Sequence, residues 1–395
     1  MIRIAADYIY TLEDYEPFEK GYVEVDDDGT VSGVGKCDDF SREENVWEGA
    51  LVPGFVNAHC HVELSHLKGK FAKGSGMAGF IDQINELRDS SSREDKIKAL
   101  SREMDSMWRH GVSAMADISN CDDSFKVKAE SPMYTRTFIE VFGTEPEDCG
   151  TVMAGARALR AEADSYGIDA SITPHACYTM SPELVSAASA EGLASGYLSY
   201  HSQESLQEEE MIEKGTGAMA ENRRRAGMST PPVTGRPSLM YFIDRLLSVH
   251  GAPFGEHILL VHNVCLTEDA ARAAMNVMDN VYWAICPLSN IFIHNTLPPV
   301  PLMRRLGLDI CMGTDSLSSN DSLDMVKEMF CVQQNFPEVP FGEILTWACL
   351  NGARSLGKSD ELGTLTTGKK PGIVGIRGLD GTGRLTRSSV SVRLV

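Results

Sequence analysis

The middle of the chain alternates between short apolar runs and longer segments in which apolar residues recur at helical spacing. Helical spacing is clearest at 79–87, 96–108, 152–163 and 239–247. Eight apolar runs are typical of buried strands, at 54–59, 112–118, 134–142, 170–175, 196–201, 258–262, 281–286 and 308–313. Eight strands alternating with helices are what a closed barrel requires. The pattern therefore predicts an α/β fold built on a (β/α)8 TIM-like barrel.

Both ends of the chain are patterned differently from the middle. Short strand-like runs at 2–4 and 22–25, and again at 362–365 and 372–376, are separated by turns rich in Gly and Asp. We expect the two ends to pair into one small β-sandwich domain. The predicted organisation is a composite β domain of residues 1–52 and 356–395, and a catalytic barrel domain of residues 53–355.

Residues 207–237 interrupt the alternation. They begin with an acidic run, pass through three arginines from Arg223 onward, and end in a segment rich in Pro and Gly. The segment follows the fifth predicted strand, on the face where barrels bind substrates. It is either a solvated loop with a short helix or a mobile lid, and in a lid Arg223 would meet an anionic group of the substrate.

Composition narrows the possible partners. The 395 residues include 36 Lys and Arg against 56 Asp and Glu, a formal charge of −20. This balance repels phosphate groups, so no nucleic acid and no membrane surface is expected as a partner. No apolar stretch approaches the roughly 20 residues of a spanning helix, and no secretory signal is visible at the start. We expect a cytoplasmic protein that acts on a small heterocyclic molecule, with a homo-oligomer left open.

The strongest chemical signal is His59-Cys60-His61, at the end of the first predicted barrel strand. Side chains two residues apart on a strand point to the same side, which here is the C-terminal mouth of the barrel. Two imidazoles at that position can bind a first-row divalent metal. The pair alone is weak evidence, because two core or solvated histidines would give the same pattern.

Further ionisable residues stand at the ends of other predicted strands. They are His175, His201, His262 and Asp315. Burying so many ionisable groups without partners would cost several kcal/mol, and a metal ion removes that cost by coordinating them. Three charged residues in or just after the first helical segment are expected to form a solvated helix face: Asp82, Glu86 and Arg88.

These motifs resemble the amidohydrolase superfamily, and within it the mononuclear nucleoside and nucleobase deaminases, which include the S-adenosylhomocysteine and aminofutalosine deaminases. The resemblance spans nearly the whole chain. It rests on PGFVNAHCH at 53–61, PHACYTMSP at 174–182, HSQE at 201–204, CPLSN at 286–290, GTDS at 313–316 and NGARSLG at 351–357.

The resemblance implies one divalent metal ion, Zn²⁺ or Fe²⁺, with four ligands: His59, His61, His201 and Asp315. It implies that Glu204 moves protons between a metal-activated water, a ring nitrogen and the leaving ammonia. It places His262 and Asp315 beside that water, and His175 against the substrate. Binuclear members carry a lysine or glutamate near the end of the fourth strand, and residues 169–178 contain neither.

The loop after the metal pair bears on the substrate. Its Glu63-Leu64-Ser65 run is closer to the aminofutalosine deaminase type, so Glu63 is a candidate contact to ribose, with an ordinary helix-face glutamate as the alternative. The resemblance implies a hydrolase of non-peptide C–N bonds that deaminates an adenine nucleoside derivative: an aminofutalosine-like compound, methylthioadenosine or S-adenosylhomocysteine. The alternatives are another heterocycle, such as guanine, cytosine or a chlorotriazine, and a catalytically silent scaffold.

Overall fold

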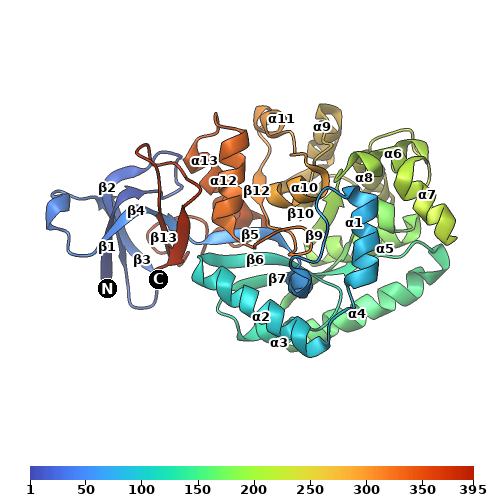
Figure 1. Ribbon diagram of the computed structural model, residues 1–395, viewed down its shortest axis with the longest axis horizontal. Coiled ribbons are helices and arrows are strands. Elements are labelled where there is room, and N and C mark those ends of the chain that lie inside the picture. The colour runs from blue at the N-terminus through green and yellow to red at the C-terminus, as the bar shows by residue number, and fades with distance from the viewer.

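The computed structural model describes residues 1–395 as a barrel of strands and helices with a β-sheet at one end (Figure 1). The eight barrel strands are β5 (Phe55–Cys60), β6 (Val112–Ser119), β7 (Tyr134–Val141), β8 (Asp169–Pro174), β9 (Tyr197–Ser202), β10 (Phe254–His262), β11 (Met278–Ile285) and β12 (Ile310–Met312). Each coincides with one of the predicted apolar runs. The α/β barrel prediction is therefore confirmed.

The barrel strands form two parallel sheets that meet at two seams. The sheet orders are β5-β6-β7-β8 and β9-β10-β11-β12. Between β8 and β9, the backbone N–H of His201 donates to the carbonyl of His175 at 2.9 Å. Between β12 and β5, the backbone N–H of Asp315 donates to the carbonyl of His59 at 3.0 Å. Each seam therefore brings two of the predicted site residues side by side.

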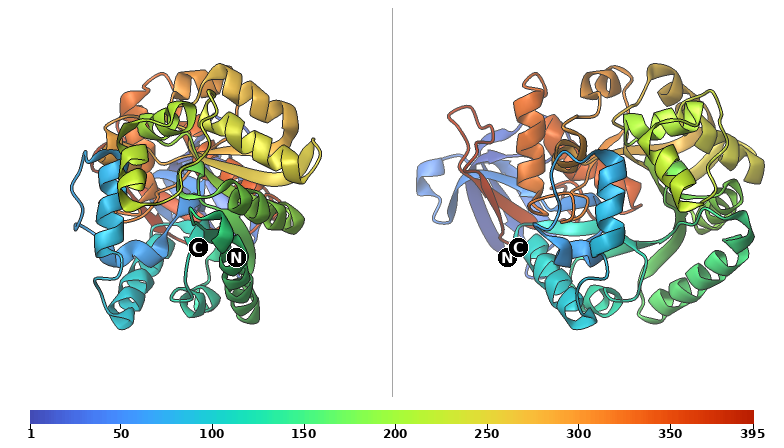
Figure 2. Two further views of the ribbon diagram at one scale, coloured as in Figure 1. Left: turned by 90° about the vertical axis from the view of Figure 1, so that its right-hand side faces the viewer. Right: turned by 45° about the vertical axis from the view of Figure 1, so that its right-hand side comes forward.

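Helices surround the strands (Figure 2). They are α1 (Gly76–Leu87), α2 (Arg93–Arg109), α3 (Phe125–Glu130), α4 (Cys149–Ser165), α5 (Pro182–Ser195), α6 (Leu206–Lys214), α7 (Gly217–Ala226), α8 (Ser238–Val249), α9 (Glu268–Val277), α10 (Pro287–His294), α11 (Val300–Arg305), α12 (Met325–Asn335), α13 (Phe341–Ala348) and α14 (Leu350–Ser355). Four short 3-10 helices are η1 (Phe40–Arg42), η2 (Val62–Leu67), η3 (Pro146–Asp148) and η4 (Cys177–Thr179). The four predicted helical segments lie within α1, α2, α4 and α8 and are confirmed.

The segment 207–237 contains two helices, so the expectation of a loop with one short helix is wrong. The hydroxyl of Ser205 caps the start of α6 by accepting the N–H of Glu208, and Gly215 ends the helix with a φ of 67°. The acidic run is the first turn of α6, where it complements the helix dipole. Both α6 and α7 contact α1, and Figure 2 shows the three helices side by side.

The two ends of the chain share one six-stranded sheet, in the order β14-β13-β4-β1-β2-β3. Its strands are β1 (Ile2–Ile9), β2 (Phe18–Val25), β3 (Val31–Lys36), β4 (Val46–Pro53), β13 (Ile373–Arg377) and β14 (Val390–Arg393). The expected pairing of the ends is the antiparallel contact of β13 with β4.

The strand expected at 362–365 is absent, because Gly363 turns the chain with a φ of 85°. One face of the terminal sheet has its own apolar cluster, and the other packs on the barrel. None of the helices combines the length and the apolar character needed to cross a membrane.

Candidate active site

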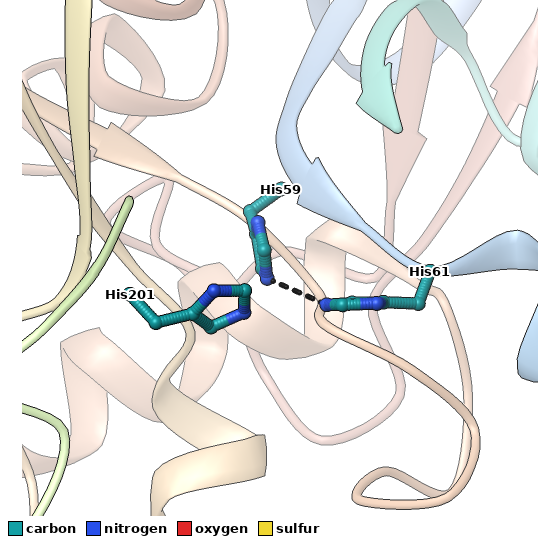
Figure 3. A group of neighbouring side chains, drawn as sticks. All are labelled: His59, His61 and His201. Carbon is teal, nitrogen blue, oxygen red and sulfur yellow. Dashed lines mark hydrogen bonds between the residues drawn. The ribbon is translucent and has the colours of Figure 1, made fainter. Parts of the chain in front are cut away.

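The four predicted metal ligands converge at the C-terminal mouth of the barrel. His59 and His61 come from β5 and the residue after it, and His201 comes from β9 (Figure 3). The Nε2 atoms of His59 and His61 lie 3.1 Å apart, and ligand nitrogens of all three histidines lie within 4.8 Å of one another. Oδ1 of Asp315 lies 3.6 Å from Nε2 of His61 and 3.8 Å from Nε2 of His59.

The chemistry of this group fits a divalent metal ion. Burial, together with the neighbouring imidazoles, lowers the pKa of His59 and of His201 well below the ordinary value, so both rings are neutral and able to donate a lone pair. Two nitrogens bound tetrahedrally to one zinc ion at about 2.0–2.1 Å lie about 3.3 Å apart, which is close to the 3.1 Å between Nε2 of His59 and Nε2 of His61. Nδ1 of His59 is buried and has no hydrogen-bond partner.

Asp315 is fixed in place by two serine hydroxyls. Ser289 and Ser319 donate to its Oδ2 at 2.6 and 2.8 Å, which leaves Oδ1 facing the histidines. Burial alone would raise the pKa of Asp315, but the imidazoles and the bond from Ser289 together lower it below its ordinary value. Asp315 is therefore an anionic side chain whose orientation is set by two hydrogen bonds, as the predicted role of a metal ligand requires.

Glu204 lies three residues beyond His201 and is also buried. Its Oε2 accepts a hydrogen bond from the hydroxyl of Tyr178 at 2.7 Å, and its Oε1 lies 3.4 Å from Nε2 of His262. Burial, reinforced by the charge of Asp315, raises the pKa of Glu204 to about 8. A carboxyl group with this pKa can both take up and release a proton near neutral pH.

His262 and His175 flank this carboxylate and the metal ligands. The side-chain amide of Asn290 lies 3.1 Å from Nδ1 of His262, and donation to Nδ1 leaves the proton of a neutral ring on Nε2, facing Glu204. The ring of His175 stacks on His201 with centroids 4.4 Å apart and lines the cavity. Both rings are therefore next to the space that a ligand would occupy.

Glu140 belongs to this group and was missed by the sequence analysis. It is buried in β7, and its Oε1 lies 3.4 Å from Nδ1 of His201. Burial is the main cause that raises the pKa of Glu140 to about 8. A glutamate near the C-terminal end of an otherwise apolar strand is the signal that could have found it.

An apolar wall and one arginine line the rest of the cavity. The apolar lining residues are Leu64, Met77, Phe80, Ile81, Ile84 and Phe142. Arg88 also lines the cavity, where its Nη2 donates to Oδ1 of Asn120 at 2.8 Å. The expectation of a solvated helix face is therefore wrong for Arg88, because the end of α1 turns it toward the strand ends.

The structure does not bring Glu63 or Arg223 into the lining of this cavity. Glu63 is buried behind it and accepts the backbone N–H of Asn120 at 3.0 Å. The guanidinium of Arg223 donates to the carbonyls of Ser229 and Tyr178, and burial lowers its pKa to about 10. Arg223 thus ties the segment after α7 to η4, which follows β8, and Glu63 supports the cavity wall.

The fold and this set of ligands define a metal-dependent hydrolase, and comparison with known families agrees. The amidohydrolase family matches residues 50–382, so the chain belongs to that family. The family and the deaminases among the similar proteins support a hydrolase of carbon–nitrogen bonds other than peptide bonds, as the resemblance of the motifs implied.

Three similar proteins illustrate the relationship. The 5-methylthioadenosine/S-adenosylhomocysteine deaminase of Moorella thermoacetica is 26% identical over 373 residues, which cover 90% of this chain and 81% of that protein. The Helicobacter pylori aminofutalosine deaminase, in complex with methylthio-coformycin, has a TM-score of 0.79 at 22% identity and covers 98% of this chain and 94% of its own. A Xanthomonas campestris adenosine deaminase with bound zinc has a TM-score of 0.72 at 21% identity, and the match covers 94% of this chain and 83% of that chain.

Proposed function

We propose that this protein is a metal-dependent deaminase that releases ammonia from an adenine nucleoside derivative by hydrolysis. The observation that carries the proposal is the position of Glu204, a buried carboxyl group with a raised pKa held between Tyr178 and His262. The named activities of the similar proteins support the same class of reaction. Methylthioadenosine, S-adenosylhomocysteine and an aminofutalosine-like nucleoside are the candidate substrates.

His59, His61, His201 and Asp315 would hold the metal ion, Zn²⁺ or Fe²⁺. Bound there, such an ion supplies a nucleophile at neutral pH, because it lowers the pKa of a bound water from 15.7 toward about 7. The backbone carbonyl of His175 accepts the Nδ1–H of His201 at 3.2 Å and so leaves Nε2 free for the ion, and Oε1 of Glu140 lies 3.4 Å from the same Nδ1.

The protein groups then move the protons of the reaction. Glu204 accepts a proton from the attacking water and delivers protons to the ring nitrogen and to the departing amine. Nε2 of His262 donates a hydrogen bond to the oxygen that becomes the carbonyl of the product. One C–O bond forms and one C–N bond breaks, so that water and the amino compound become the keto compound and ammonia.

The test is ammonia release by protein of known metal content. The panel contains adenosine, methylthioadenosine, S-adenosylhomocysteine, aminodeoxyfutalosine, guanine, cytosine and a chlorotriazine, with chloride release measured for the last. Ammonia from one or more adenine nucleosides, at about one metal ion per chain, supports the proposal. Turnover of guanine, cytosine or the chlorotriazine alone would show that the substrate is that heterocycle and not an adenine nucleoside. No turnover of any compound by the metal-loaded protein would favour a catalytically silent scaffold.

A further inference from the structure

We propose that Arg88 binds a carboxylate on the substrate, at the end of an apolar substituent that lies along α1. This inference rests on the proposed function and names the substrate class more narrowly: an adenine nucleoside that carries an apolar substituent ending in a carboxylate. The sequence analysis placed an anion-binding arginine at Arg223, and the structure assigns that role to a different residue.

Arg88 is the only lysine or arginine that lines the cavity. It stands at the C-terminal end of α1, and its guanidinium carbon lies 5.6 Å from the ring centroid of Phe142. Its side chain is 28% exposed, so the guanidinium is reachable from the cavity and remains partly shielded from bulk water. An arginine in this position attracts an anion more strongly than one on an open surface.

The hydrogen bonds of Arg88 leave donors free for a ligand. Nη2 donates to Oδ1 of Asn120 at 2.8 Å and to Oε1 of Glu63 at 3.4 Å, so Arg88 also forms an ion pair with this buried glutamate. Nε and Nη1 have no protein acceptor within hydrogen-bonding distance, so three of the five N–H donors of a guanidinium remain unengaged. Arg223 differs on this point, because carbonyl groups of the protein occupy its guanidinium.

The wall beside Arg88 defines what connects the nucleoside to the carboxylate. Phe80, Ile81 and Ile84 present apolar side chains to the cavity from α1. A substituent that buries each CH₂ group there gains about 0.8 kcal/mol, whereas a second ionic group beside this wall would lose its hydration without a partner.

The test uses two substrates that differ only in the charge of the substituent: 5′-deoxy-5′-(2-carboxyethylthio)adenosine and its methyl ester. We expect wild-type protein to have the higher kcat/KM for the acid. We expect Arg88→Met to lower kcat/KM for the acid by about 10- to 150-fold, mainly through KM, because a hydrogen bond to a charged group is lost. For the ester, kcat/KM of Arg88→Met should stay within about threefold of the wild-type value, and this retained activity also shows that the variant folds.

Two further variants separate the contact from general electrostatics. Arg88→Lys keeps the charge and should retain part of the preference for the acid. Arg93→Met removes an arginine that is 61% exposed and does not line the cavity, so it should leave both substrates unchanged. Binding of the deaminated acid by calorimetry gives a readout that does not depend on turnover, and it should weaken only when Arg88 is changed.

The outcomes distinguish this inference from the proposed function. Equal losses for the acid and the ester in Arg88→Met would overturn the inference and indicate a contact to ribose or a structural role. No loss for either substrate would also overturn it. If wild-type protein deaminates neither compound nor any other adenine nucleoside, the proposed function itself fails.

Discussion

The hydroxyl of Tyr178 donates a hydrogen bond of 2.7 Å to Oε2 of Glu204, and both side chains line the cavity. Tyr178 follows β8 and Glu204 follows β9, so the bond joins the ends of two neighbouring strands. It favours the ionised form of Glu204, while burial and the charge of Asp315 oppose ionisation. The tyrosine thus limits how far the pKa of this carboxyl group rises.

Replacing Tyr178 by Phe should move the acid limb of the pH profile. Without the hydrogen bond the pKa of Glu204 rises above about 8, and activity that needs the carboxylate is lost as pH falls through that pKa. We expect the limb of kcat/KM to move upward by about one pH unit, which corresponds to a bond of about 1.4 kcal/mol. The measurement is kcat/KM between pH 5 and pH 10.

The matched control for this variant is Tyr241→Phe. The hydroxyl of Tyr241 is also buried and makes no hydrogen bond, so its removal should leave the pH profile unchanged. An acid limb that stays in place in Tyr178→Phe would show that the bond does not set the pKa of Glu204.

Replacing Glu204 by Gln should remove turnover without removing the metal. Glutamine has nearly the same shape but cannot exchange protons, and loss of a general acid–base group costs about 10²- to 10⁴-fold in rate. The metal content should stay at that of wild-type protein, because Glu204 lies outside the group of four ligands. Activity assays paired with metal analysis check both statements, and either full activity or loss of the metal would contradict the assigned role.

Replacing Glu140 by Gln should weaken metal binding. Its Oε1 lies 3.4 Å from Nδ1 of His201, whose N–H is bonded to the carbonyl of His175 at 3.2 Å, and loss of a carboxylate beside a metal-binding ring lowers metal affinity by about 10- to 100-fold. The measurement is competition with a chelator of known affinity. Glu147→Gln changes an exposed glutamate shortly after the same strand and should leave the affinity unchanged. Equal affinities in both variants would show that Glu140 does not support His201.

The sequence predicts the barrel well because each barrel strand is buried along most of its length. β6, for example, is buried at every position, so its apolar run has a single plausible structure. His59, His61, His201 and Asp315 stand at strand ends, and the barrel geometry alone requires those ends to meet. This part of the site follows from local pattern and topology together.

Arg88 and Arg223 show what local pattern leaves undecided. Both are arginines near the end of a helix. Arg88 lines the cavity, whereas the guanidinium of Arg223 donates hydrogen bonds to the backbone carbonyls of Tyr178 and Ser229. The difference depends on how α1 and α7 are placed over the mouth. Side-chain direction at that level is set by packing between distant segments, which periodicity does not encode.

Removing one partner of a buried ion pair beside the predicted metal ligands should strongly destabilise the fold. Nζ of Lys128 lies 2.6 Å from Oδ2 of Asp117, and both side chains are 0% exposed. Lys128 also donates to the hydroxyls of Ser119 and Thr137, at 2.8 and 3.0 Å. Oδ1 of Asp117 accepts the backbone N–H of Val62, the residue that follows His61. The pair therefore holds the turn that leads out of the first two metal ligands.

Replacing Lys128 by Met should lower the free energy of unfolding by about 3–5 kcal/mol, because the charge of Asp117 is left buried without its partner. Lys126→Met is the control: Lys126 is 74% exposed, and its Nζ lies 3.9 Å from Glu130, so the change should be within about 0.5 kcal/mol. Unfolding by urea, followed by fluorescence, measures both. Adding Asp117→Asn to Lys128→Met should recover part of the loss, because the unpaired charge is then removed. Equal free energies of unfolding for Lys128→Met and Lys126→Met would show that the buried ion pair contributes no more to stability than the exposed one.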